Sequence, residues 1–283
     1  MVNCLVTKLK SVVNNSDLKK LGVLRFEVNV DSIIRRNNIH CNTLNHCKFT
    51  IVSGPVGGQI VKAGASEALD VPLGTEFFLN NSADVYYFSE LGKYVIEITN
   101  KYDIKTFAFF HDVSISLDDM KYLNTLSYAN LQGENVIGNF EDLVTHNMKS
   151  LFISNEIAGN PGESVVGDIA KIANTVITTV ILQYCGGIIG NLSSLSSHQT
   201  LKTLSITNST KITGKISDIT SIPHLSNFQC SGNKLITGSL ADFLDNGQLR
   251  NPELKLLNVN HTNIVKNSED VTTLRNLGVQ VTV

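Results

Sequence analysis

Between residues 104 and 283, hydrophobic residues recur in two short patterns that alternate along the chain. One pattern is a triplet with apolar first and third residues, such as Leu151-Phe-Ile153, and this period-two alternation predicts a short strand with one face buried. The other is an eight-residue phrase such as IIGNLSSL at 188–195, with apolar residues on both sides of a glycine. The expected strand triplets are Leu126-Ser-Tyr128, Leu151-Phe-Ile153, Val180-Ile-Leu182, Leu204-Ser-Ile206, Phe228-Gln-Cys230 and Leu257-Asn-Val259.

The glycine phrase returns with a nearly constant period. It occurs at 136–143, 165–172, 188–195, 212–219 and 236–243, with related copies at 113–120, where Ile115 replaces the glycine, and at 264–271, where Lys266 does. These positions are 23, 29, 23, 24, 24 and 28 residues apart. The period resembles that of leucine-rich repeats, in which each unit covers the apolar edge of the next. The glycine is expected where the chain turns sharply and needs a positive φ or a close approach.

Polar residues follow each triplet at a common offset. Asn130, Asn155 and Asn208 are expected to point inward there and to bond the backbone of a neighbouring turn. Other units have Tyr184, Gly232 and His261 at this offset, with Asn233 and Asn260 one residue away as substitutes. The longer units carry loops at 155–164 and 245–253 that are rich in Asn, Gly and Pro and are expected to project from the surface.

The first hundred residues follow a different pattern. Strict alternation over Leu24–Val30, with similar stretches at 47–51 and 94–98, predicts short antiparallel strands. We therefore predict a mostly β (α+β) protein with a small N-terminal antiparallel β-sandwich over 1–103 and a leucine-rich-repeat solenoid over 104–283. The stretch Ile104–Phe110 is expected to be the strand that joins the two parts.

Composition favours a folded protein and excludes several classes of partner. The chain of 283 residues is 42% hydrophobic and 17% charged, which is enough to build a packed core. A net charge of −2 argues against nucleic acid as a partner. The longest apolar run, at 176–189, is too short for membrane insertion, and residues 1–10 do not have the pattern of a signal peptide. Five scattered cysteines suit buried thiols in a reducing cytosol.

Candidate chemistry is sparse. The segment HCNTLNHC at 40–47 combines soft and imidazole ligands that could hold zinc, but adjacent His-Cys pairs point apart in an extended chain, so we expect no metal. The glycine-rich 53–59 has no following Lys-Ser or Lys-Thr and is interpreted as a hairpin turn rather than a phosphate loop. Asp118 and Asp119 are interpreted as helix-capping acids. No catalytic motif is present, so we expect neither an enzyme nor a cofactor.

The outward residues of the strands are expected to form a concave surface of small, uncharged side chains. This surface is either a partner-binding site or a merely solvated sheet. Its predicted residues are Phe152, Ser154, Ile181, Gln183, Ser205, Thr207, Gln229, Ser231, Asn258 and Asn260.

The opening MVNCLVTKLKSVVNNSDLKKLGVLRF resembles the start of short proteins from tailed phages of gut Bacteroidales, including crAss-like phages. In those proteins a brief β-rich module carries a variable part that is sometimes leucine-rich. The resemblance implies a virion structural role, such as a head fibre, decoration or tail-attached protein. It also implies assembly in the host cytoplasm and contacts with other virion proteins.

Residues 2–13 are expected to support docking or homo-oligomerisation, because a terminal alternating segment stays ordered only when it pairs with a sheet. The docking residues would be Val2, Leu5, Leu9 and Val12, while the repeats contact a host surface protein or glycan. The isolated array 104–283 is expected to fold as a monomer. The alternative is a bacterial leucine-rich-repeat protein that binds a cellular or envelope partner, and a weaker third class is a carbohydrate-active enzyme.

Overall fold

The structure is a computed structural model, and twelve stretches of the chain are described. They are 24–30, 38–43, 48–55, 60–62, 70–71, 76–78, 86–88, 90–99, 104–110, 113–132, 135–157 and 160–283. The predicted docking residues Val2, Leu5, Leu9 and Val12 lie outside these stretches, as do His46 and Cys47 of the candidate zinc segment.

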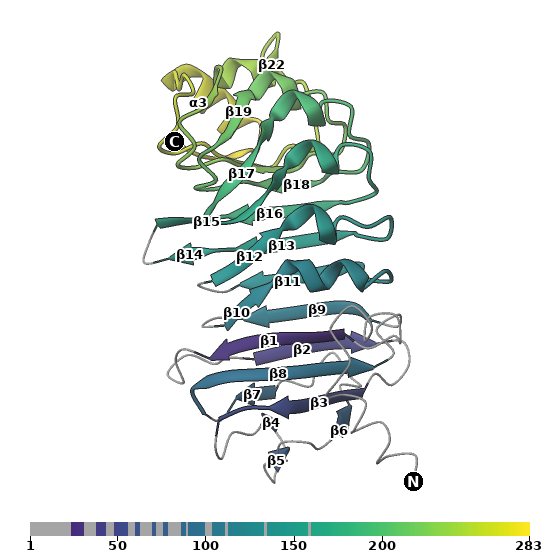
Figure 1. Ribbon diagram of the computed structural model, residues 1–283. Helices are drawn as coiled ribbons and strands as arrows, with labels where there is room; N and C mark the ends of the chain where they lie inside the picture. Colours follow the sequence, from purple (N-terminus) through teal and green to yellow (C-terminus); the bar gives the residue numbers. More distant parts are fainter. Residues whose placement is uncertain are drawn as a thin grey trace, which may run out of the picture.

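Two long sheets run side by side along the molecule (Figure 1). The glycine sheet contains the repeated glycine phrases, and the triplet sheet contains the strand triplets. In order, the glycine sheet is β6 (Glu76–Phe78), β3 (Lys48–Ser53), β8 (Gly92–Thr99), β1 (Leu24–Val30), β10 (Val113–Ser116), β12 (Asn135–Asn139), β15 (Asn160–Asp168), β17 (Cys185–Asn191), β19 (Ile212–Lys215) and β21 (Ile236–Thr237). The triplet sheet is β5 (Asp70–Val71), β4 (Ile60–Lys62), β7 (Tyr86–Phe88), β2 (Asn38–Thr43), β9 (Ile104–Phe110), β11 (Tyr128–Gln132), β13 (Ser150–Ser154), β16 (Thr179–Gln183), β18 (Thr203–Ser205), β20 (Asn227–Gln229), β24 (Leu256–Asn258) and β25 (Gln280–Thr282).

From β9 onward the chain coils through the two sheets in turn. Each unit supplies one strand to the triplet sheet, one to the glycine sheet and, in six units, one short 3₁₀ helix, and neighbouring units pair in parallel. The helices are η2 (Leu117–Tyr122), η3 (Phe140–Leu143), η4 (Ile169–Ile172), η5 (Leu192–Leu195), η6 (Ile216–Ile219) and η7 (Leu240–Phe243). The fold is mostly β with parallel sheets and few helices, which is consistent with a leucine-rich-repeat-like solenoid.

The repeated glycine has both a positive φ and a close approach to the neighbouring unit, as the sequence suggests. Gly214 has a φ of +127°, in a region that residues with a Cβ rarely adopt. An added Cβ would lie 2.8 Å from Asn191 Oδ1 and 2.9 Å from Leu192 N, at the start of the preceding helix η5. The glycine thus lets one unit turn directly over the helix start of the unit before it.

The first predicted triplet was placed three residues too early. Leu126 is buried, but Tyr128 is exposed, and it is Ala129 and Leu131 that pair with Leu151 and Ile153 of the next strand. Asn130 therefore lies within β11 rather than at the predicted inward offset. The other five triplets lie in register, as the pairings of β13, β16, β18, β20 and β24 confirm.

At the offset after the triplets, the units share a left-handed backbone conformation rather than an asparagine side chain. Tyr184, Asn208 and His261 have φ values of 56°, 57° and 55° there, and Gly232 has 80°. Only Asn155 is fully buried at this offset, where its Oδ1 accepts the Val136 N–H at 3.2 Å.

One residue later, two buried side chains link neighbouring units. Ser209 Oγ donates to the Leu182 carbonyl at 2.7 Å, and Asn233 Nδ2 donates to the Ile206 carbonyl at 2.6 Å. Asn233 therefore substitutes as predicted, whereas Asn260 is half-buried and its backbone N–H donates to Asn258 Oδ1.

The described strands before residue 104 pair antiparallel and extend both sheets. β1 pairs with β10, and β2 pairs with β9, so the sheets run continuously across the predicted boundary at 103. Strand β1 spans the predicted Leu24–Val30, and β9 spans Ile104–Phe110. The interpretation of 53–59 as a hairpin turn was wrong, because β3 and β4 belong to different sheets.

A single apolar core fills the space between the sheets. It extends from Ile51 on β3 to Val281 on β25, and it includes the fully buried Ile96, Phe107, Leu204 and Phe228. The core therefore reaches back into the N-terminal strands, beyond the start that the repeats predict.

The C-terminal end of the stack is closed by the helix α3 (Ser268–Asn276) and the strand β25. Leu274 of α3 is fully buried, and Arg275 Nη2 donates to the Val281 carbonyl at 2.9 Å. The predicted projecting loops carry two hairpins, β14 (Glu156–Ile157) with β15 and β22 (Leu244–Asp245) with β23 (Gln248–Leu249). Among the described helices, none has the length and apolar character needed to cross a membrane.

Candidate binding surface

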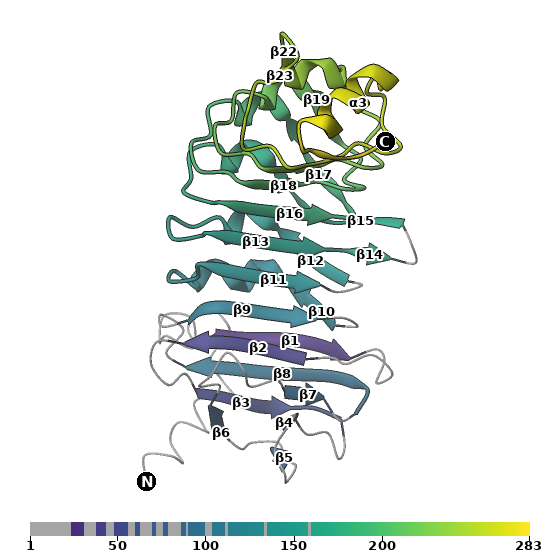
Figure 2. The same ribbon diagram turned by 180° about the vertical axis from the view of Figure 1, so that it is seen from behind.

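The strands of the triplet sheet follow one another along the stack (Figure 2). Their register places the side chains of the outer face in rows that run along the stack. The rows arise because parallel strands are in register and alternate residues lie on one face. The central row is Asn130, Phe152, Ile181, Ser205, Gln229 and Asn258, and the row before it is Tyr128, Ser150, Thr179, Thr203, Asn227 and Leu256. Neither row contains a charged residue.

Seven of the ten predicted surface residues lie on the triplet strands, the other three follow strand ends, and nine of the ten are half-buried. Ser154 and Gln183 pair across β13 and β16 in a third row, and Thr207 and Ser231 follow the ends of β18 and β20. Phe152 and Ile181 lie side by side and form an apolar patch between polar neighbours.

Ser205 departs from the prediction, because it is fully buried. It is flanked in its row by the larger Ile181 and Gln229, and Gln183 Nε2 donates to its hydroxyl at 3.4 Å. The larger neighbours cover the small Ser205 side chain. Ser205 therefore lies beneath the surface and is not available to contact a partner.

The misplaced first triplet concealed two further surface residues on β11, Tyr128 and Gln132, with the buried Asn130 between them. Asn130 Nδ2 donates to the hydroxyl of Tyr128 at 3.3 Å, and Gln132 Nε2 donates to Asn130 Oδ1 at 3.0 Å. Tyr128 is 38% exposed and extends the apolar area beside Phe152. The alternation of Tyr-Ala-Asn-Leu-Gln at 128–132 was the available signal, and it begins at the last residue of the triplet that was chosen.

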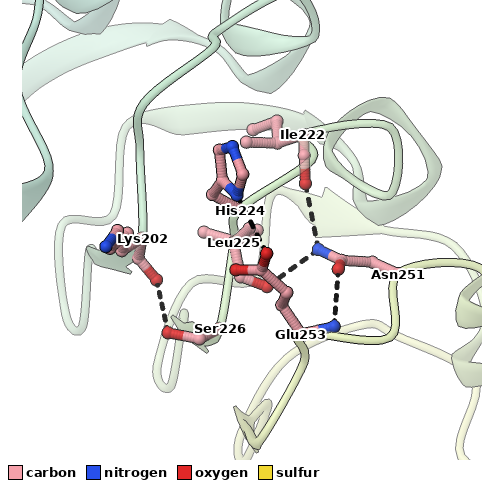
Figure 3. A network of polar contacts seen from close by, with 7 residues as sticks. All are labelled: Lys202, Ile222, His224, Leu225, Ser226, Asn251 and Glu253. Carbon is pink, nitrogen blue, oxygen red and sulfur yellow. Dashed lines mark hydrogen bonds and ion pairs between the residues drawn. The ribbon is translucent and has the colours of Figure 1, made fainter.

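At the edge where the chain enters the triplet sheet, polar contacts join neighbouring units (Figure 3). Asn251 Nδ2 donates to the carbonyls of Ile222 and Leu225, both at 2.9 Å. His224 Nδ1 and Glu253 Oε1 lie 2.9 Å apart, and each side chain is about half exposed. These contacts fix the turns that precede the strands.

Three buried titratable side chains, Cys185, Cys230 and His198, do not have the properties of reactive groups. Burial raises the pKa of the Cys230 thiol to about 12, and it also raises the pKa of the Cys185 thiol. Neither thiol is therefore available as a thiolate near neutral pH. His198 is buried and accepts the backbone N–H groups of Thr200 and Leu201 on Nδ1, and burial lowers its pKa.

The candidate zinc segment is only partly described. His40 and Cys41 are adjacent residues of β2, opposite Ala108 and Phe107 of β9. Within the described stretches, no group of three or more His, Cys, Asp or Glu residues could hold a metal ion.

Comparison with known proteins adds little to this description. No family model matches the chain, and no curated protein does. A solved structure of the functional domain of InlJ from Listeria monocytogenes, which includes a cysteine ladder, is 17% identical over 62% of this chain, with a TM-score of 0.31. The chain covers 38% of the length of that structure.

Proposed function

We propose that the protein is a non-enzymatic adhesion protein that uses the outer face of the triplet sheet to contact a partner. The observation that carries the proposal is the pair of uncharged rows described above, which hold the Tyr128, Phe152 and Ile181 side chains on parallel, in-register strands. Aromatic and aliphatic groups amid amides and hydroxyls are suited to protein or glycan surfaces, because they offer apolar contact and hydrogen bonds without the desolvation cost of charges.

We further propose that this adhesion protein belongs to a phage virion, docks through its N-terminal part and forms a homo-oligomer. The resemblance of residues 1–26 to proteins of tailed phages of gut Bacteroidales supports this proposal. Val2, Leu5, Leu9 and Val12 would supply the docking contacts. The alternative is a bacterial leucine-rich-repeat protein that binds a cellular or envelope partner through the same face.

Binding of fluorescently labelled full-length protein to candidate host cells would test the adhesive face. Phe152→Asp and Ile181→Asp should each lower cell binding at least about tenfold, because each places a charge in the apolar centre of the contact. Val166→Asp on the glycine sheet is the matched control, since Val166 is 43% exposed on the other sheet. Equal binding by all three variants and wild type would contradict the adhesive role of this face.

Native mass spectrometry would test the docking proposal. The full chain should form a closed homo-oligomer, and removal of residues 1–13 should leave a monomer. A monomeric full-length protein would favour the bacterial alternative. An unchanged oligomer after the removal would exclude residues 1–13 as the docking segment.

A further inference from the structure

A column of residues follows the edge at which the chain enters the triplet sheet, two positions before the first inward residue of each unit. Along the stack the column is Lys105, Ser127, Lys149, Thr178, Lys202, Ser226 and Lys255. Each backbone N–H donates to the carbonyl of the preceding member at 2.8 or 2.9 Å, so the column is continuous. Lysine alternates strictly with a hydroxyl residue over all seven positions.

The hydroxyl residues have a structural role in this column. Ser127 Oγ, Thr178 Oγ1 and Ser226 Oγ donate to the carbonyls of the lysines before them at 3.2, 3.0 and 3.1 Å. Figure 3 shows this contact between Ser226 and Lys202. The small hydroxyl side chains therefore hold the turns together, which explains their presence.

The lysine ammonium groups have no such role. All four lysines are exposed, and among the described residues none has an acidic partner within ion-pair distance. Glu253 lies near this edge but contacts His224. Acids such as Asp168, Asp218 and Asp242 instead accept backbone N–H groups at the 3₁₀ helices that follow the glycine strands. As far as the described residues go, the edge thus presents a row of ammonium groups without acidic partners.

The spacing of this row limits the class of ligand. Neighbouring parallel strands lie about 4.8 Å apart, so lysines in every second unit are about 10 Å apart. In a DNA duplex each strand carries a phosphate about every 3.4 Å along the helix axis, so most of its charges would meet no lysine. A polysaccharide with one acidic group on every second sugar carries charge at an interval comparable with that of the lysines.

The surface beside the lysines is suited to the uncharged parts of such a chain. The neighbouring row, from Tyr128 through Ser150, Thr179 and Thr203 to Asn227, offers hydroxyl and amide groups that can bond sugar hydroxyls. Tyr128 and Phe152 offer apolar surface to the faces of sugar rings.

We propose that the lysine row, Lys105, Lys149, Lys202 and Lys255, binds an acidic polysaccharide that lies along the stack across the triplet strands. The inference rests on the proposed function and deepens it, because it names the ligand class for the same face. Each exposed ammonium–carboxylate contact is weak, and the affinity comes from several contacts made by one chain.

The test measures binding of hyaluronan, in which acidic and neutral sugars alternate, to the full-length protein at low and physiological ionic strength. Lys149→Gln and Lys202→Gln should each weaken binding about twofold to fivefold, and the fourfold Lys→Gln variant at least about tenfold. Binding should weaken with added salt, and the salt dependence should be smaller in the variants. Lys171→Gln and Lys215→Gln, which remove exposed lysines from the side of the glycine sheet, are the matched controls and should bind as wild type does.

Several outcomes would overturn the proposal. They are equal binding of hyaluronan by the fourfold variant and the controls, equal binding of neutral dextran, and tighter lysine-dependent binding of single-stranded DNA or polyglutamate. If the fourfold variant binds hyaluronan normally while Phe152→Asp still abolishes cell binding, the lysine proposal fails and the adhesive function stands. If hyaluronan binding depends on the lysines but Phe152→Asp and Ile181→Asp leave cell binding intact, the adhesive function fails instead.

Discussion

At the scale of single residues, the stack depends on positions that allow one unit to approach the next. The repeated glycines and the buried links of Ser209 and Asn233 join a residue of one unit to the backbone of its neighbour. The glycine position can be tested directly, because Gly278 has a positive φ like Gly214 but lacks its close contact with a neighbouring unit.

Gly214→Ala should lower the free energy of unfolding by about 2–4 kcal/mol, because the new Cβ meets both a strained φ and the backbone of the preceding unit. Gly278→Ala is the matched control. Gly278 also has a positive φ, of 87°, but an added Cβ there would meet nothing within 4 Å, so only about 1 kcal/mol of strain is expected. Urea unfolding measures both changes. Equal losses would show that the close approach at Gly214 adds nothing.

His198 should make stability depend on pH. Burial lowers its pKa from the usual 6.5, so the folded protein binds fewer protons than the unfolded chain in the acid range. The contribution of neutral His198 to the free energy of unfolding is fully present above about pH 6.5. It is lost as the pH falls below that value towards the lower pKa of the folded protein.

The substitution His198→Asn should remove this dependence. Asn251 occupies the equivalent position, three residues before the buried Leu254, and its Oδ1 accepts a backbone N–H as His198 Nδ1 does. Unfolding midpoints of both proteins between about pH 5 and 8 provide the measurement. Parallel curves for wild type and variant would show that His198 does not cause the dependence.

At the scale of elements, the sequence pattern identifies repeat units most reliably where the backbone conformation requires a particular residue. The period could be predicted from the glycine phrases because no residue with a Cβ easily replaces glycine at that turn. The first triplet was misplaced because Leu126 is buried in the turn before β11 and imitates a strand residue. The strand β2 was not predicted, since Asn38–Thr43 is largely polar and lacks apolar alternation. The lysine column was missed because its members precede the strands, where no hydrophobic pattern marks them.

The 3₁₀ helices provide a prediction at this scale. Asn191 Oδ1 accepts the Ser193 N–H at 2.9 Å and caps η5, whereas Lys215 occupies the same position before η6 and makes no side-chain capping bond. Asn191→Ala should therefore lower the free energy of unfolding by about 1 kcal/mol, and Lys215→Asn should raise it by roughly 0.5–1 kcal/mol. Thermal and urea unfolding measure both. Changes of the same sign at the two positions would contradict the capping role.

At the scale of the whole molecule, strand pairing between distant segments determines the architecture. The sequence indicated two parts with a boundary near 103, and the change of hydrophobic pattern there is real. No local pattern indicated that β1 would pair with β10 and β2 with β9, because such pairing depends on contacts far apart in the chain. The N-terminal strands thus cover the first edges of both parallel sheets.

This arrangement revises the expectation that residues 104–283 fold alone as a monomer. Their isolation would leave β9 and β10 as unpaired edges and uncover the core beside Phe107, which is fully buried in the whole chain. Exposed flat edges are templates for pairing with another chain. We expect the 104–283 fragment to self-associate and to unfold at lower urea concentration than the full protein. Residues 14–283, which retain all the described N-terminal strands, are the control and should stay monomeric and unfold at a higher urea concentration than 104–283. Sedimentation velocity and urea unfolding of the two truncated proteins test this expectation. A monomeric 104–283 fragment with the same unfolding midpoint as residues 14–283 would show that the repeats need no N-terminal cover.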